Sequence, residues 1–237
     1  MEIKVDALVL RTADYGESDR MLTLFTLQNG KLSAAAKGVR KAKARLNFAA
    51  QPFCFGEYVL AQKGERYTVI SAFATDAFYG LRMDVGKLYA AASLAGLCDA
   101  VLPEGLVNEE LFLLAVPALG EMCEKEETEA LISFFLRLLT LSGYMIDLSA
   151  CADCGAPLTG KPYFDFAGGC FTCENCARGS RVRESTFQLL RKCAGMEYDP
   201  AYILPEAGKR ALRLLYLYFT RKTETQVKAL SQYIDFL

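Results

Sequence analysis

Two pairs of cysteines in the second half of this 237-residue chain constrain its fold more than any other feature. Cys151 and Cys154 form one C-x2-C unit, Cys173 and Cys176 form the other, and eighteen residues separate the two units. Two residues between ligands allow both sulfurs to face one ion, and four thiolates at about 2.3 Å make a closed tetrahedral zinc site. The spacing therefore predicts one structural Zn²⁺ per chain, bound by these four residues, with no open position for a substrate water.

The fifth cysteine of this region leaves an alternative for the second pair, because Cys170 and Cys173 also have C-x2-C spacing. Gly168 and Gly169 indicate that Cys170 lies on a strand returning toward the second pair, so we assign Cys173 and Cys176 as ligands. An iron–sulfur or redox role for the thiolates is the alternative to structural zinc. The remaining cysteines stand in apolar surroundings and are expected in the core: Cys54, Cys98, Cys123 and Cys193.

Residue types and motifs that are missing argue against an enzyme. The sequence has no histidine, which removes the commonest general acid–base and every mixed Cys/His metal site. It has neither a GxxxxGK[ST] phosphate loop nor a GxGxxG motif after a strand. No signal peptide pattern is present, and the apolar stretches are shorter than the roughly 18–20 residues that cross a bilayer. We expect a non-catalytic, cytoplasmic protein without membrane association, whose cysteines remain reduced.

The first eighty residues have the pattern of β-structure. Apolar residues alternate over residues 3–9, which is the period of a half-buried strand. Asn29-Gly30 lies between two apolar runs and predicts a hairpin with a type I′ turn, in which both central residues have positive φ. Lys63-Gly64 marks a second hairpin. Short, hairpin-linked strands of this kind predict a five-stranded OB-type barrel, with a β-meander or an SH3-like barrel as the alternative.

From Met83 onward the apolar residues recur at helical spacing. Helices are expected over residues 85–101, 111–122 and 130–145, the third with Thr128 as its N-cap. After the cysteines, Ser185-Thr186 is expected to cap a helix that ends at Gly195, and Pro205-Glu206 to open one that ends at Arg221.

These patterns together predict an α+β protein with two domains. Residues 1–80 form the OB-type barrel, and residues 81–237 form a helical domain into which a four-cysteine zinc module is inserted at residues 149–183. Within the module, residues 161–166 and the Gly168-Gly169 turn are expected to fold the second cysteine pair back onto the first.

The charge is strongly uneven along the chain although the net value is −1. Residues 1–70 have a net charge of +4, residues 71–150 of −8, and the remainder of +3. Such asymmetry indicates separate surfaces with different partners. The basic residues of the first part cluster in one predicted loop, and flanking segments add three more: Lys37, Arg40, Lys41, Lys43 and Arg45 in the loop, with Arg11, Arg20 and Lys31 beside it.

A cationic loop beside the groove of an OB barrel favours binding of a nucleic-acid backbone, while nearby aromatic rings can stack on bases. The aromatic candidates are Phe48, Phe53, Phe55 and Tyr58. The alternative is a solvated charged loop without a ligand. A second alternative for the whole chain is a zinc-ribbon factor that binds RNA or acts in transcription.

Several stretches resemble the bacterial RecO family, the recombination mediator proteins of DNA repair. They are VLRTADYGESDRMLTLFT and GKLSAAAKGVRKAKARL in the first part, and GYMIDLSACADCG with YFDFAGGCFTCENC in the second. The resemblance covers essentially the whole chain in order. It implies an OB domain followed by a helical domain with the zinc module, binding of single- and double-stranded DNA, annealing of complementary strands, and partnership with RecR and single-strand-binding protein in loading RecA.

The resemblance also assigns roles to residues of this chain. The loop cations Lys37, Arg40, Lys41, Lys43 and Arg45 become the candidates for DNA contact, with Arg11 and Lys31 beside them. Arg178, Arg181 and Arg183 extend that surface beyond the second cysteine pair. The helical domain of such proteins receives the acidic tail of single-strand-binding protein, for which the candidate residues are Arg210, Arg213 and Arg221.

Overall fold

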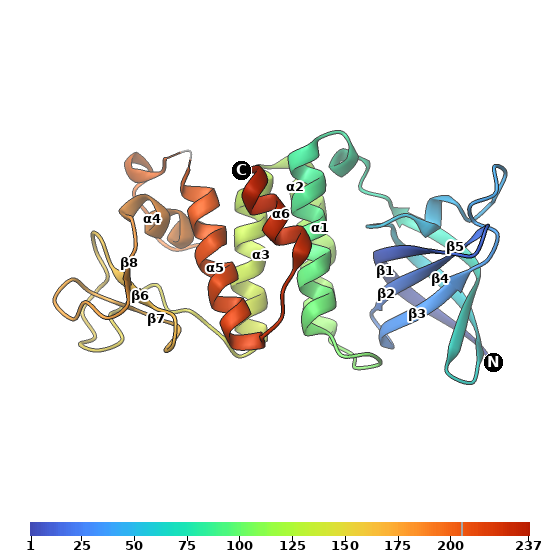
Figure 1. The fold of residues 1–237 in the computed structure, drawn as a ribbon, viewed down its shortest axis with the longest axis horizontal. Coiled ribbons are helices and arrows are strands. Elements are labelled where there is room, and N and C mark those ends of the chain that lie inside the picture. Colours follow the sequence, from blue (N-terminus) through green and yellow to red (C-terminus); the bar gives the residue numbers. More distant parts are fainter. Residues whose placement is uncertain (205) are drawn as a thin grey trace. The chain divides into compact units, whose positions relative to one another are not determined.

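The computed structural model describes residues 1–204 and 206–237, and its contacts group them into two compact units, Met1–Glu124 and Lys125–Leu237 (Figure 1). The first unit holds the barrel and two helices, and the second holds four helices and the cysteine-rich module. None of the helices in the described residues combines the length and the apolar character needed to cross a bilayer.

Five strands form the closed barrel of the first unit, in the order β1-β2-β3-β5-β4. Strand β1 is long enough to pair with β2 through its second half and with β4 through its first half, and a parallel contact between β3 and β5 completes the closure. This is the predicted OB-type barrel. The strands are β1 (Glu2–Tyr15), β2 (Asp19–Thr26), β3 (Gly30–Ala36), β4 (Phe55–Lys63) and β5 (Arg66–Asp76).

The two predicted hairpins are present, but the turn type expected at Asn29-Gly30 was wrong. Thr26 pairs with Gly30, so the turn contains three residues, and of the Asn-Gly pair only Gly30 has positive φ, at 67°. The Thr26 hydroxyl accepts the N–H of Asn29 and donates to the carbonyl of Gly30, which satisfies the polar groups of the turn. A longer turn closed by one left-handed glycine replaces the two-residue turn because Thr26 supplies these bonds.

Helices α1 (Val85–Val101) and α2 (Glu109–Glu124) pack in the same unit as the barrel. The ring of Phe112 in α2 lies edge-on to Phe25 of β2 and Phe55 of β4, with centroid distances of 5.2 and 6.1 Å. Gly30 approaches the backbone of Leu106 so closely that a β-carbon would lie 2.2 Å from its carbonyl oxygen. These contacts place the boundary between the two units after α2, whereas the sequence pattern puts the domain boundary at residue 80.

The second unit contains the predicted helical bundle, although its helix starts differ from the expected caps. The third helix begins at Glu127, three residues before the expected residue 130, because the Glu126 carboxylate, and not Thr128, accepts the N–H of Glu129. Residues Ser185 and Thr186 lie inside the first turn of the fourth helix, and neither caps it. Pro205, the expected start of the fifth helix, lies outside the described residues. The helices are α3 (Glu127–Leu141), α4 (Glu184–Cys193), α5 (Ala207–Thr223) and α6 (Lys228–Phe236).

A three-stranded sheet in the order β7-β6-β8 forms the body of the cysteine-rich module. Its strands are β6 (Tyr163–Asp165), β7 (Cys170–Thr172) and β8 (Ser180–Arg181), and Asp165 pairs with Cys170 across the predicted glycine turn. Aromatic rings join the module to the helices: Phe164 lies edge-on to Tyr218 of α5 at 5.6 Å, and Phe171 contacts Phe187 of α4 at 5.2 Å. The module and the helices therefore share one core.

Candidate metal centre and nucleic-acid interface

The structure brings together the four cysteines predicted as zinc ligands. The sulfur atoms of Cys151, Cys154, Cys173 and Cys176 all lie within 4.8 Å of one another. Cys170 lies on β7 outside this group, as the glycine turn predicts, and its sulfur accepts a hydrogen bond from the Arg178 guanidinium at 3.3 Å. Four sulfurs at such mutual distances are the donor set of a structural zinc site.

The two cysteine pairs have the same backbone design. In the first, the N–H of Gly155 donates to the carbonyl of Cys151, and in the second the N–H of Ala177 donates to that of Cys173. The residue after each pair has positive φ, 70° at Gly155 and 43° at Ala177. The tight turn that aims two sulfurs at one point thus ends in a left-handed residue, which glycine adopts without strain and alanine does not.

Electrostatics of the cluster favour a bound cation. The backbone N–H of Cys173 donates to the sulfur of Cys151 and is the largest cause that lowers the pKa of the Cys151 thiol to about 6. By contrast, the hydrogen bond with the Cys154 side chain is the largest cause that raises the pKa of Cys176 to about 12. Neighbouring thiolates repel one another, so four of them become compatible only when a divalent ion supplies positive charge. The residues present fit Zn²⁺.

Arg178 links the strands around this cluster. Its guanidinium contacts the carboxylate of Asp153 at 3.1 Å and that of Asp165 at 3.2 Å, in addition to the sulfur of Cys170. Its backbone N–H and carbonyl both bond to the Thr172 hydroxyl. With two carboxylates already bound, Arg178 contributes little free charge to a DNA surface, and its position indicates a structural role in the module.

The other cysteines do not belong to the metal cluster. Cys54 and Cys98 are fully buried, as expected, and burial raises the pKa of both thiols. Cys123 and Cys193 are only partly buried. Burial raises the pKa of Cys193 to about 12, so this thiol remains protonated at neutral pH.

The predicted cationic loop follows β3 and is fixed to the barrel at its start. Val39 is buried in the barrel core, with 1% of its surface exposed. The N–H of Gly38 donates to the Asp19 carboxylate at 2.7 Å, and the N–H of Arg40 donates to the carbonyl of Ser18. The bond from Gly38 is the largest cause that lowers the pKa of Asp19, and Lys37 adds to it.

Beyond this anchor the loop presents cations to solvent. Arg40 pairs with Asp14 at 3.3 Å, so its charge is partly neutralised. The four other cations of the loop are exposed, and none has an ion-pair partner among the residues that the structure describes: Lys37, Lys41, Lys43 and Arg45. A tethered loop with four exposed cations is suited to contact successive phosphates.

Arg11 and Lys31 occupy a different environment from the loop. Both bind Asp99 near the end of α1: Arg11 Nε lies 3.0 Å from one carboxylate oxygen and Lys31 Nζ lies 2.8 Å from the other. Lys31 Nζ also donates to the Asp99 carbonyl, and only 14% of its side chain is exposed. The geometry makes these two residues a bridge between the barrel and α1 within the first unit.

The aromatic candidates divide by exposure. Phe48 is 42% exposed at the end of the cationic loop, whereas Phe53 and Tyr58 are buried and Phe55 packs against Phe112. Sequence reasoning missed Tyr15, which is 63% exposed beside the Gly16 carbonyl that accepts a hydrogen bond from Arg40. An aromatic residue at the end of β1 directly before Gly16 was the available signal.

The basic residues of the second unit also differ in availability. Arg210 binds the Glu206 carboxylate and the hydroxyls of Ser185 and Thr186, which ties α5 to α4. Arg221 lies over the ring of Phe166 at 4.9 Å. Arg181, Arg183 and Arg213 are exposed as well, and Arg181 contacts Glu174 at 3.4 Å.

Comparisons with known proteins agree with this architecture. The family model described as recombination protein O N terminal matches residues 1–78, and the one described as recombination protein O C terminal matches residues 82–231. DNA repair protein RecO of Alkaliphilus metalliredigens is 38% identical over 179 residues, which cover 74% of this chain and 72% of that protein. DNA repair protein RecO of Myxococcus xanthus is 32% identical over 238 residues, which cover 98% of this chain and 95% of that protein. The chain therefore belongs to the RecO family of DNA repair proteins.

Proposed function

We propose that the chain is a non-catalytic mediator of DNA repair and homologous recombination. It binds single- and double-stranded DNA through the cationic loop at residues 37–45, anneals complementary strands, and assists RecA loading together with RecR and single-strand-binding protein. Residues 1–80 are the DNA-binding domain and residues 81–237 the helical domain. Zn²⁺ at the four cysteines maintains the fold of the module at residues 149–183. The protein acts in the cytoplasm, on the DNA of the nucleoid.

One observation carries this proposal: four exposed cations, with no ion-pair partner in the described part of the chain, lie on a loop whose start is held by Val39 and Asp19. A binding loop gains affinity when its cations are positioned before the ligand arrives, and the anchor at Val39 and Asp19 fixes the start of this loop. Each cation that contacts a phosphate releases counterions, so DNA affinity must fall as the salt concentration rises. Membership of the RecO family and the OB-type barrel support DNA as the polyanion.

Binding of a labelled oligonucleotide across a salt series tests the proposal. Replacing Lys37, Lys41 and Lys43 with glutamine should weaken binding to single strands and reduce the slope of log affinity against log salt by about 2, because each single-strand contact contributes about 0.7. The matched control replaces Lys4, Arg137 and Lys228, three exposed cations elsewhere, and changes the net charge equally. Equal slopes for the two triple variants would reject the loop as the DNA site.

Annealing and the choice of nucleic acid need separate measurements. Complementary fluorescent strands should anneal faster with the wild-type chain than with the loop variant, and the control variant should match the wild type.

In competition, single-stranded DNA should displace the probe at least as well as RNA of the same sequence. Preferential displacement by RNA would favour the zinc-ribbon alternative. Pull-down of RecR and single-strand-binding protein with the loop variant tests whether the partner sites are distinct from the DNA site.

A further inference from the structure

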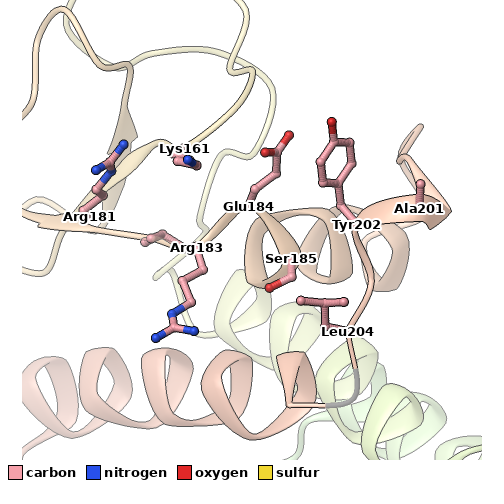
Figure 2. Close-up of a pocket in the computed structure, with 9 residues that line it drawn as sticks. Lys161, Arg181, Arg183, Glu184, Ser185, Ala201, Tyr202 and Leu204 are labelled. Carbon is pink, nitrogen blue, oxygen red and sulfur yellow. The ribbon is translucent and has the colours of Figure 1, made fainter.

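A hollow of about 660 Å³ in the second unit has no role in the proposed DNA contact of the barrel. It lies where β8 of the cysteine-rich module leads into α4, and residues 201–204 close its other side (Figure 2). The residues that give it chemical character are Lys161, Arg181, Arg183, Glu184, Tyr202 and Leu204. Three cations and one carboxylate make its lining positive.

The cations of this hollow are available to a ligand. Within the described part of the chain, neither Lys161 nor Arg183 has an ion-pair partner. Arg181 contacts Glu174 at 3.4 Å, but more than half of each of these two side chains is exposed, so the pair is weak. An anion that enters the hollow therefore has no strong internal pair to displace.

The arrangement of the side chains favours an extended ligand over a single small anion. Figure 2 shows Lys161 and Arg181 on one side, Tyr202 and Leu204 on the other, and the Arg183 guanidinium pointing away from Lys161. Because these cations do not converge on one point, they are better placed to contact successive phosphates of a nucleic-acid strand than one small anion. Tyr202 is 45% exposed, so its ring is accessible to a base that stacks on it. A duplex offers no free base faces, and an acidic peptide makes no use of the exposed ring.

We propose that this hollow is a second site for single-stranded nucleic acid, in which Lys161, Arg181 and Arg183 contact phosphates and Tyr202 stacks on a base. The inference rests on the proposed function, because it assumes that the chain binds DNA. The inference goes beyond the proposed function because it gives each of the two units a strand-binding surface of its own. A chain with two such surfaces can hold two segments of single-stranded DNA at once, which is what annealing requires.

Photocrosslinking of the full-length protein to an oligothymidylate that contains 5-iodouracil tests the proposal. We expect crosslinked peptides from two separate regions, one around the cationic loop and one that contains Tyr202. In the variant with glutamine at positions 37, 41 and 43, the crosslink at Tyr202 should persist while the crosslinks at the loop decrease strongly. Loss of both crosslinks in that variant would show that the hollow has no strand-binding activity of its own, and would overturn the proposal.

Affinity measurements provide the second test. Replacing Lys161 and Arg183 with glutamine should weaken single-strand binding about tenfold relative to the charge-matched variant Arg137→Gln with Lys228→Gln. Tyr202→Leu should weaken it by a similar factor, whereas Tyr202→Phe, which retains a stacking face, should not. Circular dichroism and zinc content verify that each variant is folded.

The outcomes separate this inference from the proposed function. If the loop variant loses DNA binding while the variants of the hollow match their controls, the inference fails and the proposed function stands. If the wild type shows no salt-dependent DNA binding, both fail. A peptide of ten aspartates is the remaining probe. If the variants of the hollow lose binding of this peptide but not of DNA, the site belongs to an acidic protein partner, and the inference is overturned.

Discussion

Gly169 in the turn of the cysteine-rich module lies against Tyr218 of α5 so closely that a β-carbon would stand 2.1 Å from the tyrosine hydroxyl oxygen. Gly169 also has a positive φ of 67°. The same tyrosine meets the ring of Phe164 at 5.6 Å, and the neighbouring Lys222 donates to the Ala167 carbonyl. The turn between β6 and β7 is thus the point at which the module docks on the helices.

Gly169→Ala should therefore lower the free energy of unfolding by about 3 kcal/mol or more. The left-handed backbone accounts for about 1 kcal/mol and the clash with the Tyr218 ring for the rest. Gly195→Ala is the matched control, because Gly195 has a φ of 71° but a β-carbon there would meet nothing within 4 Å, so only the backbone cost applies. Chemical denaturation of the zinc-loaded variants measures both. Equal losses of unfolding free energy in the two variants would show that the turn can shift away from Tyr218 of α5 without cost.

Metal content should distinguish the four clustered cysteines from their neighbour. The purified chain should hold about one zinc and be colourless, since four thiolates make a closed structural site. Cys176→Ser should lose the metal and expose the module to proteolysis, because zinc binding and local folding are coupled. Cys170→Ser should retain it, since the Cys170 sulfur lies outside the cluster. A brown protein with iron, or loss of zinc in Cys170→Ser, would contradict the assignment.

The sequence predicts the parts of this structure that depend on local pattern. Alternation in β1, the Asn29-Gly30 turn and the C-x2-C units each encode a feature within a few residues, so the barrel and the cysteine cluster could be predicted. The choice of Cys173 over Cys170 also follows locally, from the glycine turn that puts Cys170 on β7. Helix α6 is too short to stand out, although Leu230, Tyr233 and Ile234 have helical spacing.

Charge partners could not be predicted, because they come from distant parts of the chain. The sequence predicts that Arg11 and Lys31 flank the DNA contact. Both instead bind Asp99, which lies 88 residues from Arg11 and 68 residues from Lys31 in the sequence. The sequence likewise predicts that Arg178 extends the DNA-binding surface, yet its guanidinium binds Asp153 and Asp165. A basic residue in a sequence reveals its charge but not whether an acidic residue already neutralises it. Only the folded chain shows that Lys37, Lys41, Lys43 and Arg45 lack an ion-pair partner among the described residues, whereas Arg40 has one.

The bridge at Asp99 should stabilise the first unit. Asp99→Asn leaves the largely buried ammonium of Lys31 without its counter-charge and should cost about 1–3 kcal/mol of unfolding free energy. The control is Glu57→Gln, which breaks the pair between Lys4 and Glu57, where the side chains are 67% and 40% exposed. That change should cost less than about 1 kcal/mol. Denaturation of both variants in the same buffer measures the difference, and a smaller loss for Asp99→Asn would contradict the bridge.

The left-handed residue of the second cysteine pair offers a stabilising substitution. Ala177 has a φ of 43°, the position that Gly155 fills in the first pair, so Ala177→Gly should raise stability by up to about 1 kcal/mol. Ala152 is exposed in a turn of the first pair without positive φ, and there glycine should destabilise by about 0.5–1 kcal/mol. The thermal midpoints of the zinc-loaded variants should shift in opposite directions. A shift of the same sign in both would show that the strain at Ala177 is not significant.

Asp19 should control the order of the cationic loop. Asp19→Asn removes the charged acceptor of the Gly38 N–H, so exchange of that amide should accelerate severalfold and DNA binding should weaken without any change in the loop cations. Because the bond from Gly38 lowers the pKa of Asp19 below its ordinary value of 3.8, the anchor is fully present above pH 3.8 and is lost as the pH falls through the lower pKa of the folded chain. Carbon NMR of the labelled carboxyl group measures this pKa directly. The control is Glu17→Gln, in the turn just before Asp19, and it should leave Gly38 exchange unchanged. Equal acceleration in both variants would show that general charge, and not the Asp19 bond, orders the loop.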